Sequence, residues 1–236
     1  MNIEEAKKIT LSLIDTFNKA SRVALDLREV GLKKEIKSDN TPVSNGDIEV
    51  NKILTNKIQE ITPNIVIVSE ESSNHKADDN LKDFWLIDPI DGTRDYINNR
   101  DEFTLNAALI LDKKPVIGII TAPAKKRVFY SYGLSNSYEF INGQQVCLID
   151  KKKNYKELTA VSYSNELKPE ILEIHKKYKI NSHQKMKSSL KFCVIAAGEF
   201  DMYVAEPRAC EWDIAAGHAI LEHAGGKITD FNGDKI

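Results

Sequence analysis

The sequence predicts a layered protein in which an α+β half is followed by an α/β half. Amphipathic helices are expected within the first 61 residues, short apolar strands follow as far as residue 141, and strands alternate with helices from residue 158 onward. The chain of 236 residues is long enough for one large domain or two closely packed subdomains. The charge run Lys151-Lys-Lys-Asn154 is the expected boundary between an N-terminal subdomain, 1–150, and a C-terminal subdomain, 151–236.

The N-terminal subdomain begins with helices and continues with strands. Apolar residues recur at helical spacing over 3–28 and over 47–61, and Pro63 ends the second pattern. Asp39-Asn-Thr-Pro42, between the helices, has the composition of a turn. The expected strands are short apolar runs bounded by polar or turn-forming residues, at 65–68, 84–87, 103–111, 115–121, 127–132 and 137–141. A polar loop is expected at 74–82, and Asn142-Gly143 is a further turn.

The C-terminal subdomain alternates between the two kinds of element. Helices are expected at 169–177, 190–197 and 214–223. The strands between and after them are expected at 159–162, 185–187, 202–205 and 227–229. No internal repeat and no low-complexity segment interrupts this order.

The composition favours a small substrate over a polymer. A hydrophobic content of 42% and a charged content of 29% are those of an ordinary soluble globular protein. The net charge of -2 gives no general attraction to nucleic acid or to an anionic membrane. Basic and aromatic residues do not interleave as they do on nucleic-acid-binding surfaces. We therefore expect no nucleic-acid polymer as a partner.

The cysteines and the apolar runs of the sequence indicate the cellular compartment in which the protein is expected. Cys147, Cys193 and Cys210 are widely spaced and form no CxxC pair, so the sequence predicts free thiols and no zinc site. The N-terminus lacks the order of a signal peptide, and no apolar run approaches the ~18–20 residues of a membrane span. A cytoplasmic protein is expected, and peripheral association with the inner membrane is left open.

The most informative segment is Trp85-Leu-Ile-Asp88-Pro-Ile-Asp91-Gly-Thr93. Two carboxylates three residues apart follow an apolar strand, where a tight turn holds them rigidly and lets them share a divalent cation. The N–H groups of Gly92 and Thr93 open the next segment and can face a phosphate. The alternative is a polar loop with an Asx-type turn.

Acidic residues also lie at other element ends. Glu70 and Glu71 follow a strand, and Asp213 begins a helix. Gathering such carboxylates in one cleft is unfavourable unless cations neutralise them, and oxygen-only ligands select Mg²⁺ rather than zinc. Two Mg²⁺ roughly 3.5–4 Å apart suit hydrolysis of a phosphate monoester, because they polarise the phosphoryl group and activate water. No GxSxG motif or Cys–His pair suggests a protein nucleophile.

Three segments together resemble the signatures of a known family. Glu70-Glu71, Asp88-Pro-Ile-Asp-Gly-Thr93 and Trp212-Asp213-Ile-Ala-Ala are similar to those of the lithium-sensitive, magnesium-dependent phosphatases that include inositol monophosphatase. The resemblance spans essentially the whole chain as one family domain. It implies a layered αβαβα sandwich, the sugar-phosphatase fold, with two or three Mg²⁺ ions.

The resemblance also implies roles for individual residues. Glu70, Asp88 and the carbonyl of Ile90 would hold the first Mg²⁺, and Glu70 would also reach a third, weaker ion. Asp88, Asp91 and Asp213 would hold the second. Thr93 would bind the attacking water, with Asp47 orienting Thr93 and acting as base, and the N–H groups of Gly92 and Thr93 would bind the scissile phosphate. The alternative for Asp47 is a helix N-cap, which is compatible with the catalytic role.

Within the family, several segments resemble the 3'(2'),5'-bisphosphate nucleotidase branch. They are 93–106, Gly118-Ile-Ile-Thr-Ala-Pro123 and Ser188-Ser-Leu-Lys-Phe-Cys193. This resemblance implies that Ser188 or Ser189 and Lys191 contact the substrate, and a lysine beside serine hydroxyls suits a second phosphate. The branch usually has an aromatic-x-Arg group before the Trp-Asp pair, whereas this chain has Tyr203-Val-Ala-Glu-Pro-Arg208.

That departure leaves two substrate classes open. Glu206 stands where inositol monophosphatases place a glutamate that binds substrate hydroxyls, and Arg208 is the candidate replacement for the missing arginine. Relatives usually continue past Asn232-Gly-Asp-Lys-Ile236, so the protein is expected to be short or truncated at its C-terminus.

The resemblance and the residues together predict a Mg²⁺-dependent phosphomonoesterase. The expected substrate is adenosine 3',5'-bisphosphate, a by-product of sulfate activation, which would lose its 3'-phosphate, and 3'-phosphoadenylyl sulfate is a second candidate. The alternatives are inositol-1-phosphate or another small sugar phosphate, and a non-catalytic metal-binding regulatory protein. A homodimer is a further expectation.

Overall fold

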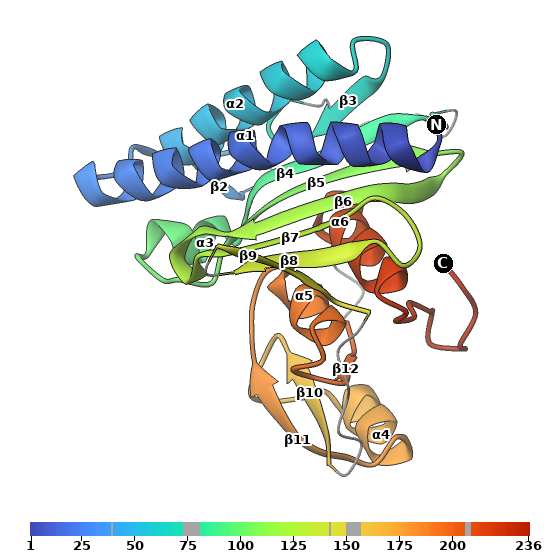
Figure 1. Cartoon of the computed structure of the whole chain (residues 1–236). Helices are drawn as coiled ribbons and strands as arrows, with labels where there is room; N and C mark the ends of the chain where they lie inside the picture. Colours follow the sequence, from blue (N-terminus) through green and yellow to red (C-terminus); the bar gives the residue numbers. More distant parts are fainter. Residues whose placement is uncertain (39, 73–80, 142, 150–156, 206–208) are drawn as a thin grey trace.

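The computed structural model describes residues 1–38, 40–72, 81–141, 143–149, 157–205 and 209–236 (Figure 1). The predicted boundary at 151–154 lies outside the described residues, as do Asn142, most of the predicted loop 74–82, and Glu206 and Arg208. Among the helices of the described residues, none is long and apolar enough to cross a bilayer.

Two long helices form the first layer. Helix α1 (Ile3–Val30) begins at a capping box, in which Asn2 accepts a hydrogen bond from the Glu5 N–H and the Glu5 side chain accepts one from the Asn2 N–H, both 2.9 Å. Helix α2 is Asn45–Ile61. Between them, β1 (Lys34–Ile36) pairs antiparallel with β2 (Pro42–Ser44), where the sequence had predicted only a turn.

The second layer is a mixed sheet. Among the described residues it has seven strands in the order β3-β4-β5-β6-β7-β8-β9. Their bounds are Val66–Ser69, Phe84–Asp91, Thr104–Leu111, Lys114–Ala122, Arg127–Ser131, Ser137–Ile141 and Gln144–Cys147. Strands β3 and β4 are parallel, and every later neighbouring pair is antiparallel. A single turn of helix, α3 (Thr93–Ile97), follows β4, and a short 3-10 turn, η1 (Pro123–Lys125), follows β6.

The remaining layers come from the C-terminal part of the chain. Helices α5 (Leu190–Ala196) and α6 (Glu211–His223) lie on the sheet face opposite α1 and α2 (Figure 1). Beyond them is a small parallel sheet that in the described residues has the order β11-β10-β12, with β10 at Leu158–Ser162, β11 at Ile180–Lys185 and β12 at Met202–Tyr203. Helix α4 (Pro169–Lys177) covers its far side. The layers therefore follow the order of an αβαβα sandwich, and the predicted fold class is confirmed.

Apolar side chains fill both faces of the large sheet. On one face, Leu13 and Phe17 of α1 pack with Trp85 and Leu105 of the sheet in a single buried cluster. On the other, Ile120 packs with apolar residues of α5 and α6. Because both faces are covered, the ends of the central strands are held rigidly, and the acidic residues lie at one of these ends.

Two of the predicted strands are wrong, and both errors concern polar segments. The strand predicted at 185–187 is β11, which ends at Lys185, and the segment predicted at 227–229 forms only an isolated bridge between Thr229 and Lys235. Strand β11 is an edge strand whose side chains are mostly exposed, so it has no apolar alternation that could reveal it. The hairpin β1–β2, strand β9 and helix α3 were missed because each is short.

Candidate active site

Asp88 and Asp91 lie in the last part of β4, at an irregularity of the strand. Asp88 is paired with Asn106 of β5 and Asp91 with Thr104, and the register shifts between these two pairs. The strand therefore runs on through Asp91, with a bulge between the carboxylates, and does not stop at Ile87. The pairing of β4 with β3 ends at Ile87, directly before Asp88, and the pairing with β5 includes Asp88, so the neighbouring strands fix the backbone at this point.

Asp213 reaches the same place from helix α6. Asp88, Asp91 and Asp213, which we call the acidic trio, each offer one oxygen, and these oxygens all lie within 4.8 Å of one another. Asp213 is the third residue of α6, and its Oδ2 accepts a hydrogen bond of 2.8 Å from the N–H of Cys210. The start of the helix thus fixes the direction of this carboxylate.

The charges and burial of the acidic trio are those of a cation site. Burial, and then the carboxylates of Asp91 and Glu70, raise the pKa of Asp88 well above its usual range. Burial and the charge of Asp91 raise the pKa of Asp213 to about 6. Within the described part of the chain, Oδ1 of Asp88 is buried and has no hydrogen-bond partner. A divalent cation would provide both that partner and the missing positive charge, and carboxylate oxygens suit a hard ion, so the residues present fit such a cation.

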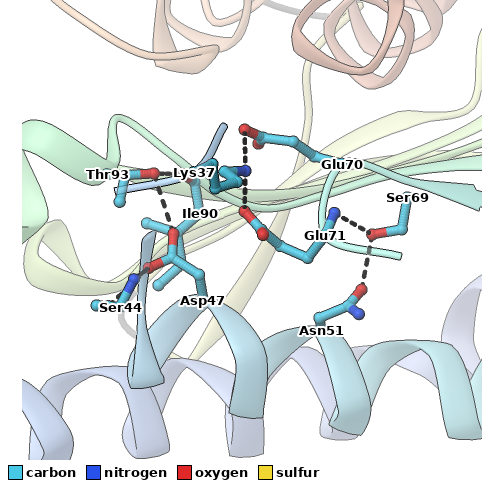
Figure 2. Close-up of polar contacts among 9 residues, drawn as sticks. All are labelled: Lys37, Ser44, Asp47, Asn51, Ser69, Glu70, Glu71, Ile90 and Thr93. Carbon is cyan, nitrogen blue, oxygen red and sulfur yellow. Dashed lines mark hydrogen bonds and ion pairs between the residues drawn. The ribbon is translucent and has the colours of Figure 1, made fainter. Parts of the chain in front are cut away.

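Glu70 and Glu71, which follow β3, are held by a lysine of the chain. Nζ of Lys37 lies 3.2 Å from Oε1 of Glu70 and 2.8 Å from Oε1 of Glu71 (Figure 2). Burial raises the pKa of Glu70, and the charge of Lys37 acts against that rise. Ser69 Oγ donates a hydrogen bond of 2.7 Å to Oδ1 of Asn51 in α2, which anchors the strand that precedes the two glutamates.

Asp47 and Thr93 meet beside Ile90 (Figure 2). Thr93 Oγ1 lies 3.0 Å from Oδ1 of Asp47 and 3.1 Å from the carbonyl oxygen of Ile90. Oδ2 of Asp47 accepts hydrogen bonds from N and Oγ of Ser44, at 2.8 and 2.6 Å. The N-cap of α2 is therefore Ser44 and not Asp47, which serves the capping box with one oxygen and Thr93 with the other. Burial is the main cause that raises the pKa of Asp47 to about 6.

A cavity of about 530 Å³ extends from the acidic trio toward the small sheet. It is lined by two members of the acidic trio, Asp91 and Asp213, and also by Tyr163, Lys191 and Tyr203. Nζ of the buried Lys191 donates a hydrogen bond of 2.5 Å to the carbonyl of Ser188 and lies 5.0 Å from the centre of the Tyr203 ring. Ser188 and Ser189 also line the cavity, but Ser189 is bonded to Asp91 and is only 2% exposed. The volume is within the range of ligand pockets.

Sequence reasoning missed two residues of this region. Lys37 lies in a polar segment with no motif around it, and nothing local indicated that it would reach Glu70. Asn106 gave a signal that was not used: it is the one amide side chain in the apolar run 103–111, and a buried polar side chain needs a partner. Its Nδ2 donates a hydrogen bond of 2.9 Å to Oγ of Ser189.

The model of the inositol monophosphatase family matches residues 3–236. The chain belongs to this family. A curated relative, the 3'(2'),5'-bisphosphate nucleotidase CysQ of Buchnera aphidicola subsp. Acyrthosiphon pisum (strain APS), is 37% identical over 207 residues, which cover 85% of this chain and 75% of the relative. The CysQ of Salmonella typhimurium is 32% identical over 204 residues, which cover 85% of this chain and 80% of the relative.

Solved structures agree with this assignment. The crystal structure of CysQ from Bacteroides thetaiotaomicron, described as a bacterial member of the inositol monophosphatase family, has a TM-score of 0.69 and 28% identity and covers 92% of this chain and 86% of that chain. The IMPase of Thermotoga maritima has a TM-score of 0.76 at 23% identity, covers 98% of this chain and 88% of that chain, and supports the fold alone. This inositol monophosphatase family member therefore belongs to the CysQ branch, as the sequence motifs predicted.

Proposed function

We propose that this chain is a Mg²⁺-dependent 3'(2'),5'-bisphosphate nucleotidase that removes the 3'-phosphate of adenosine 3',5'-bisphosphate, and that 3'-phosphoadenylyl sulfate is a second substrate. The observation that carries the proposal is the acidic trio in a chain of the CysQ branch. Among the described residues, the buried Oδ1 of Asp88 has no hydrogen-bond partner, and a cation would provide one. A regulatory protein without activity would not need Asp47 and Thr93 hydrogen-bonded beside that trio.

The proposed ligands form overlapping sets. Glu70, Asp88 and the carbonyl of Ile90 would hold one Mg²⁺, Asp88, Asp91 and Asp213 a second, and Glu70 a third, weaker ion. The carbonyl oxygen of Ile90 lies 3.1 Å from Oγ1 of Thr93 and has two lone pairs, so one is available to a metal. When bound, the ions would polarise the phosphoryl group, lower the pKa of a water and neutralise the leaving oxygen.

Asp47 and Thr93 are proposed to orient and deprotonate the attacking water. Thr93 donates its hydroxyl proton to Asp47, so a lone pair of Oγ1 is left to accept a hydrogen bond from the water. A base works best when its pKa lies near the working pH, and the pKa of Asp47, raised to about 6, is close to that condition. The N–H groups of Gly92 and Thr93 are proposed to bind the scissile phosphate.

Lys191 is proposed to bind the phosphate that is not cleaved, with Ser188 beside it. Lys191 lines the same cavity as Asp91 and Asp213, so one substrate with two phosphates could contact the lysine and the metal site together. The rings of Tyr163 and Tyr203 lie near Nζ and exclude water from it, which strengthens an ionic hydrogen bond. Inositol-1-phosphate has no second phosphate for this lysine. Glu206 is still proposed to bind substrate hydroxyls if the substrate is a sugar phosphate. Arg208 is still proposed to replace the arginine of the nucleotidase branch.

A parallel phosphate-release assay tests the proposal. Wild-type protein is incubated with Mg²⁺ and either adenosine 3',5'-bisphosphate or inositol-1-phosphate, and each reaction is repeated with EDTA. We expect turnover of the bisphosphate at a higher kcat/KM and none with EDTA. Preference for inositol-1-phosphate would favour the sugar phosphatase instead, and no release from either substrate would favour the regulatory protein. Cytoplasmic location and a homodimer also stay proposals, which fractionation and light scattering of the purified protein can test.

A further inference from the structure

Ser189 makes two short hydrogen bonds to one oxygen of Asp91. Its backbone N–H donates to Oδ2 of Asp91 at 2.5 Å, and its Oγ lies 2.6 Å from the same oxygen. Both bonds go to Oδ2, so the other oxygen of the carboxylate is left without a bond from Ser189. A carboxylate held in this way has one oxygen anchored to the protein and one that can face a ligand.

The same hydroxyl also reaches the helix that carries Asp213. Oγ of Ser189 lies 2.7 Å from the backbone carbonyl oxygen of Asp213, and Nδ2 of Asn106 donates to Oγ at 2.9 Å. A hydroxyl has one proton and two lone pairs. Asn106 occupies a lone pair, which directs the single proton toward Asp91 and Asp213. Ser189 therefore ties β4, β5 and α6 together directly behind two members of the acidic trio.

The surroundings of Ser189 keep this arrangement rigid. Ser189 is 2% exposed and Asn106 is 1% exposed. The preceding Ser188 has a left-handed backbone conformation, φ 58°, and its carbonyl accepts the hydrogen bond from Lys191. A non-glycine residue in this conformation is held there by its contacts. The single proton of the Ser189 hydroxyl is directed at protein acceptors and its side chain is buried, so Ser189 has no proton left to donate to a substrate phosphate.

We infer that Ser189, oriented by Asn106, is a positioning residue that sets the distance between the metal-ligating carboxylates Asp91 and Asp213, and not a substrate contact. The inference rests on the metal site of the proposed function. It gives Ser189 a different role from Ser188 and Lys191, with which the sequence had grouped it. Outer-shell partners of metal ligands commonly change metal affinity by about 10–100-fold when they are removed.

The test measures metal binding in the absence of substrate. Mn²⁺ is titrated calorimetrically into the metal-free wild type, Ser189→Ala and Ser137→Ala. Ser137 is the matched control, because its buried Oγ also donates to a carbonyl of α6, that of Ile220 at 2.8 Å, far along the helix from Asp213. We expect Ser189→Ala to weaken Mn²⁺ binding about tenfold or more. Ser137→Ala should bind as the wild type does, although both changes delete one buried hydroxyl.

A second variant separates positioning from general stability. Oδ1 of Asn106 is buried without a partner in the described part of the chain, so the similarly shaped Asn106→Leu removes an unsatisfied atom together with the donor to Ser189. Its melting temperature in EDTA should be unchanged or higher, while its Mn²⁺ affinity falls. Ser189→Thr, which keeps the hydroxyl, should restore part of the affinity lost in Ser189→Ala.

Steady-state kinetics distinguish the two roles of Ser189. With saturating Mg²⁺, the positioning role predicts that Ser189→Ala lowers kcat while KM for the bisphosphate changes little. When Mg²⁺ is varied at saturating substrate, the variant should need a higher Mg²⁺ concentration for half-maximal activity. Wild-type Mn²⁺ affinity in Ser189→Ala, combined with a raised KM, would overturn the inference and restore the substrate contact. If the wild type itself binds no Mn²⁺, the proposed function fails as well, so the two failures are distinguishable.

Discussion

Asp47 and Thr93 join the first turn of α2 to the first residue of α3 through one hydrogen bond of 3.0 Å, from Thr93 Oγ1 to Asp47 Oδ1. The carboxylate cannot turn away, because Ser44 holds its other oxygen with two bonds. The pair therefore presents a fixed hydroxyl to the space beside the acidic trio. The role proposed for the pair depends on that hydroxyl and not on the volume of the side chain.

Replacing Thr93 by valine should lower kcat about a hundredfold or more, because the attacking water loses its orienting oxygen. The isosteric side chain should leave the fold intact, and Thr93→Ser should retain most activity. Thr10→Val is the control: it removes a buried threonine hydroxyl in α1, bonded to the carbonyl of Ala6, away from the site. Activity assays and melting curves of the three variants check this. Near-normal kcat in Thr93→Val would remove Thr93 from the mechanism.

Asp88→Asn should nearly abolish activity, because Asp88 is proposed to bridge both ions. The metal-free variant should fold, since the change removes repulsion with Asp91 and Glu70. Circular dichroism in EDTA and a phosphate-release assay in Mg²⁺ measure the two effects. Wild-type protein in EDTA should likewise be inactive, and full turnover under that condition would contradict the metal hypothesis.

The stability of the metal-free protein should depend on pH through Asp213. The pKa of Asp213 is raised from 3.8 to about 6, so its contribution to stability is fully present below about pH 4 and is lost as the pH rises through 6. Buried His223, with its pKa lowered to about 4, acts in the opposite direction, because its contribution is lost as the pH falls. The comparison of wild type with Asp213→Asn isolates the carboxylate.

In EDTA, the urea midpoint of Asp213→Asn should exceed that of the wild type by an amount that grows between about pH 4 and 6 and then levels off. The expected gain is on the order of 1 kcal/mol or more, or about 2–4 °C in Tm. With Mg²⁺ the wild type should recover its advantage, because the bound cation stabilises the ionised carboxylate. If the difference between the two urea midpoints does not change with pH, ionisation of Asp213 does not destabilise the metal-free protein.

Lithium should inhibit the enzyme in a manner that substrate does not relieve. If Asp88, Asp91 and Asp213 form the second metal site, Li⁺ can occupy it after hydrolysis and slow product release. Inhibition kinetics at several substrate concentrations should then be uncompetitive or noncompetitive. Hard ions compete at oxygen sites on the order of tens of millimolar. If Li⁺ at this concentration does not inhibit the enzyme, the second metal site does not control turnover.

Lys191 and Glu206 separate the two substrate classes. Lys191→Ala should raise KM for adenosine 3',5'-bisphosphate by roughly ten- to a hundredfold, since a hydrogen bond to a charged group is worth about 1.5–3 kcal/mol, and should affect a monophosphate much less. Glu206→Gln should matter little for the nucleotide but impair turnover of inositol-1-phosphate if that is the true substrate. Both variants are measured on both substrates. If only Glu206→Gln has an effect, and only on inositol-1-phosphate, the sugar phosphatase is correct.

The sequence predicted the acidic trio because each member lies in a short contiguous segment at the end of an apolar run. Asp88 and Asp91 share one segment, and Trp212 precedes Asp213 in another. The long helices and the central strands could be predicted for the same reason, since their periodicity reflects burial on one side or on both. The β1–β2 hairpin gave no such signal, because β1 is exposed and each strand has only three residues.

The sequence does not predict which side chains from distant segments contact one another, because the direction of each side chain depends on the folded backbone. Lys37, which follows β1, contacts Glu70, which follows β3, and no spacing along the chain encodes that contact. Ser189 was identified beside Lys191 as part of one motif, yet the two side chains diverge: Ser189 toward Asp91, and Lys191 toward Ser188 and Tyr203. The backbone at the start of α5 decides this, and a one-dimensional pattern does not record it.

Helix α6 lies so close to the large sheet that Gly118 of β6 has no space for a methyl group. A side chain there would collide with the carbonyl of Ala216 and with the side chain of Ala219, both of which follow Asp213 in α6. An inherited Gly118→Ala change would therefore present as a metal-binding defect, although it alters no acidic residue. A genetic screen for lost activity should recover Gly118 alongside Asp213, and high Mg²⁺ in the growth medium should rescue the former more readily than the latter.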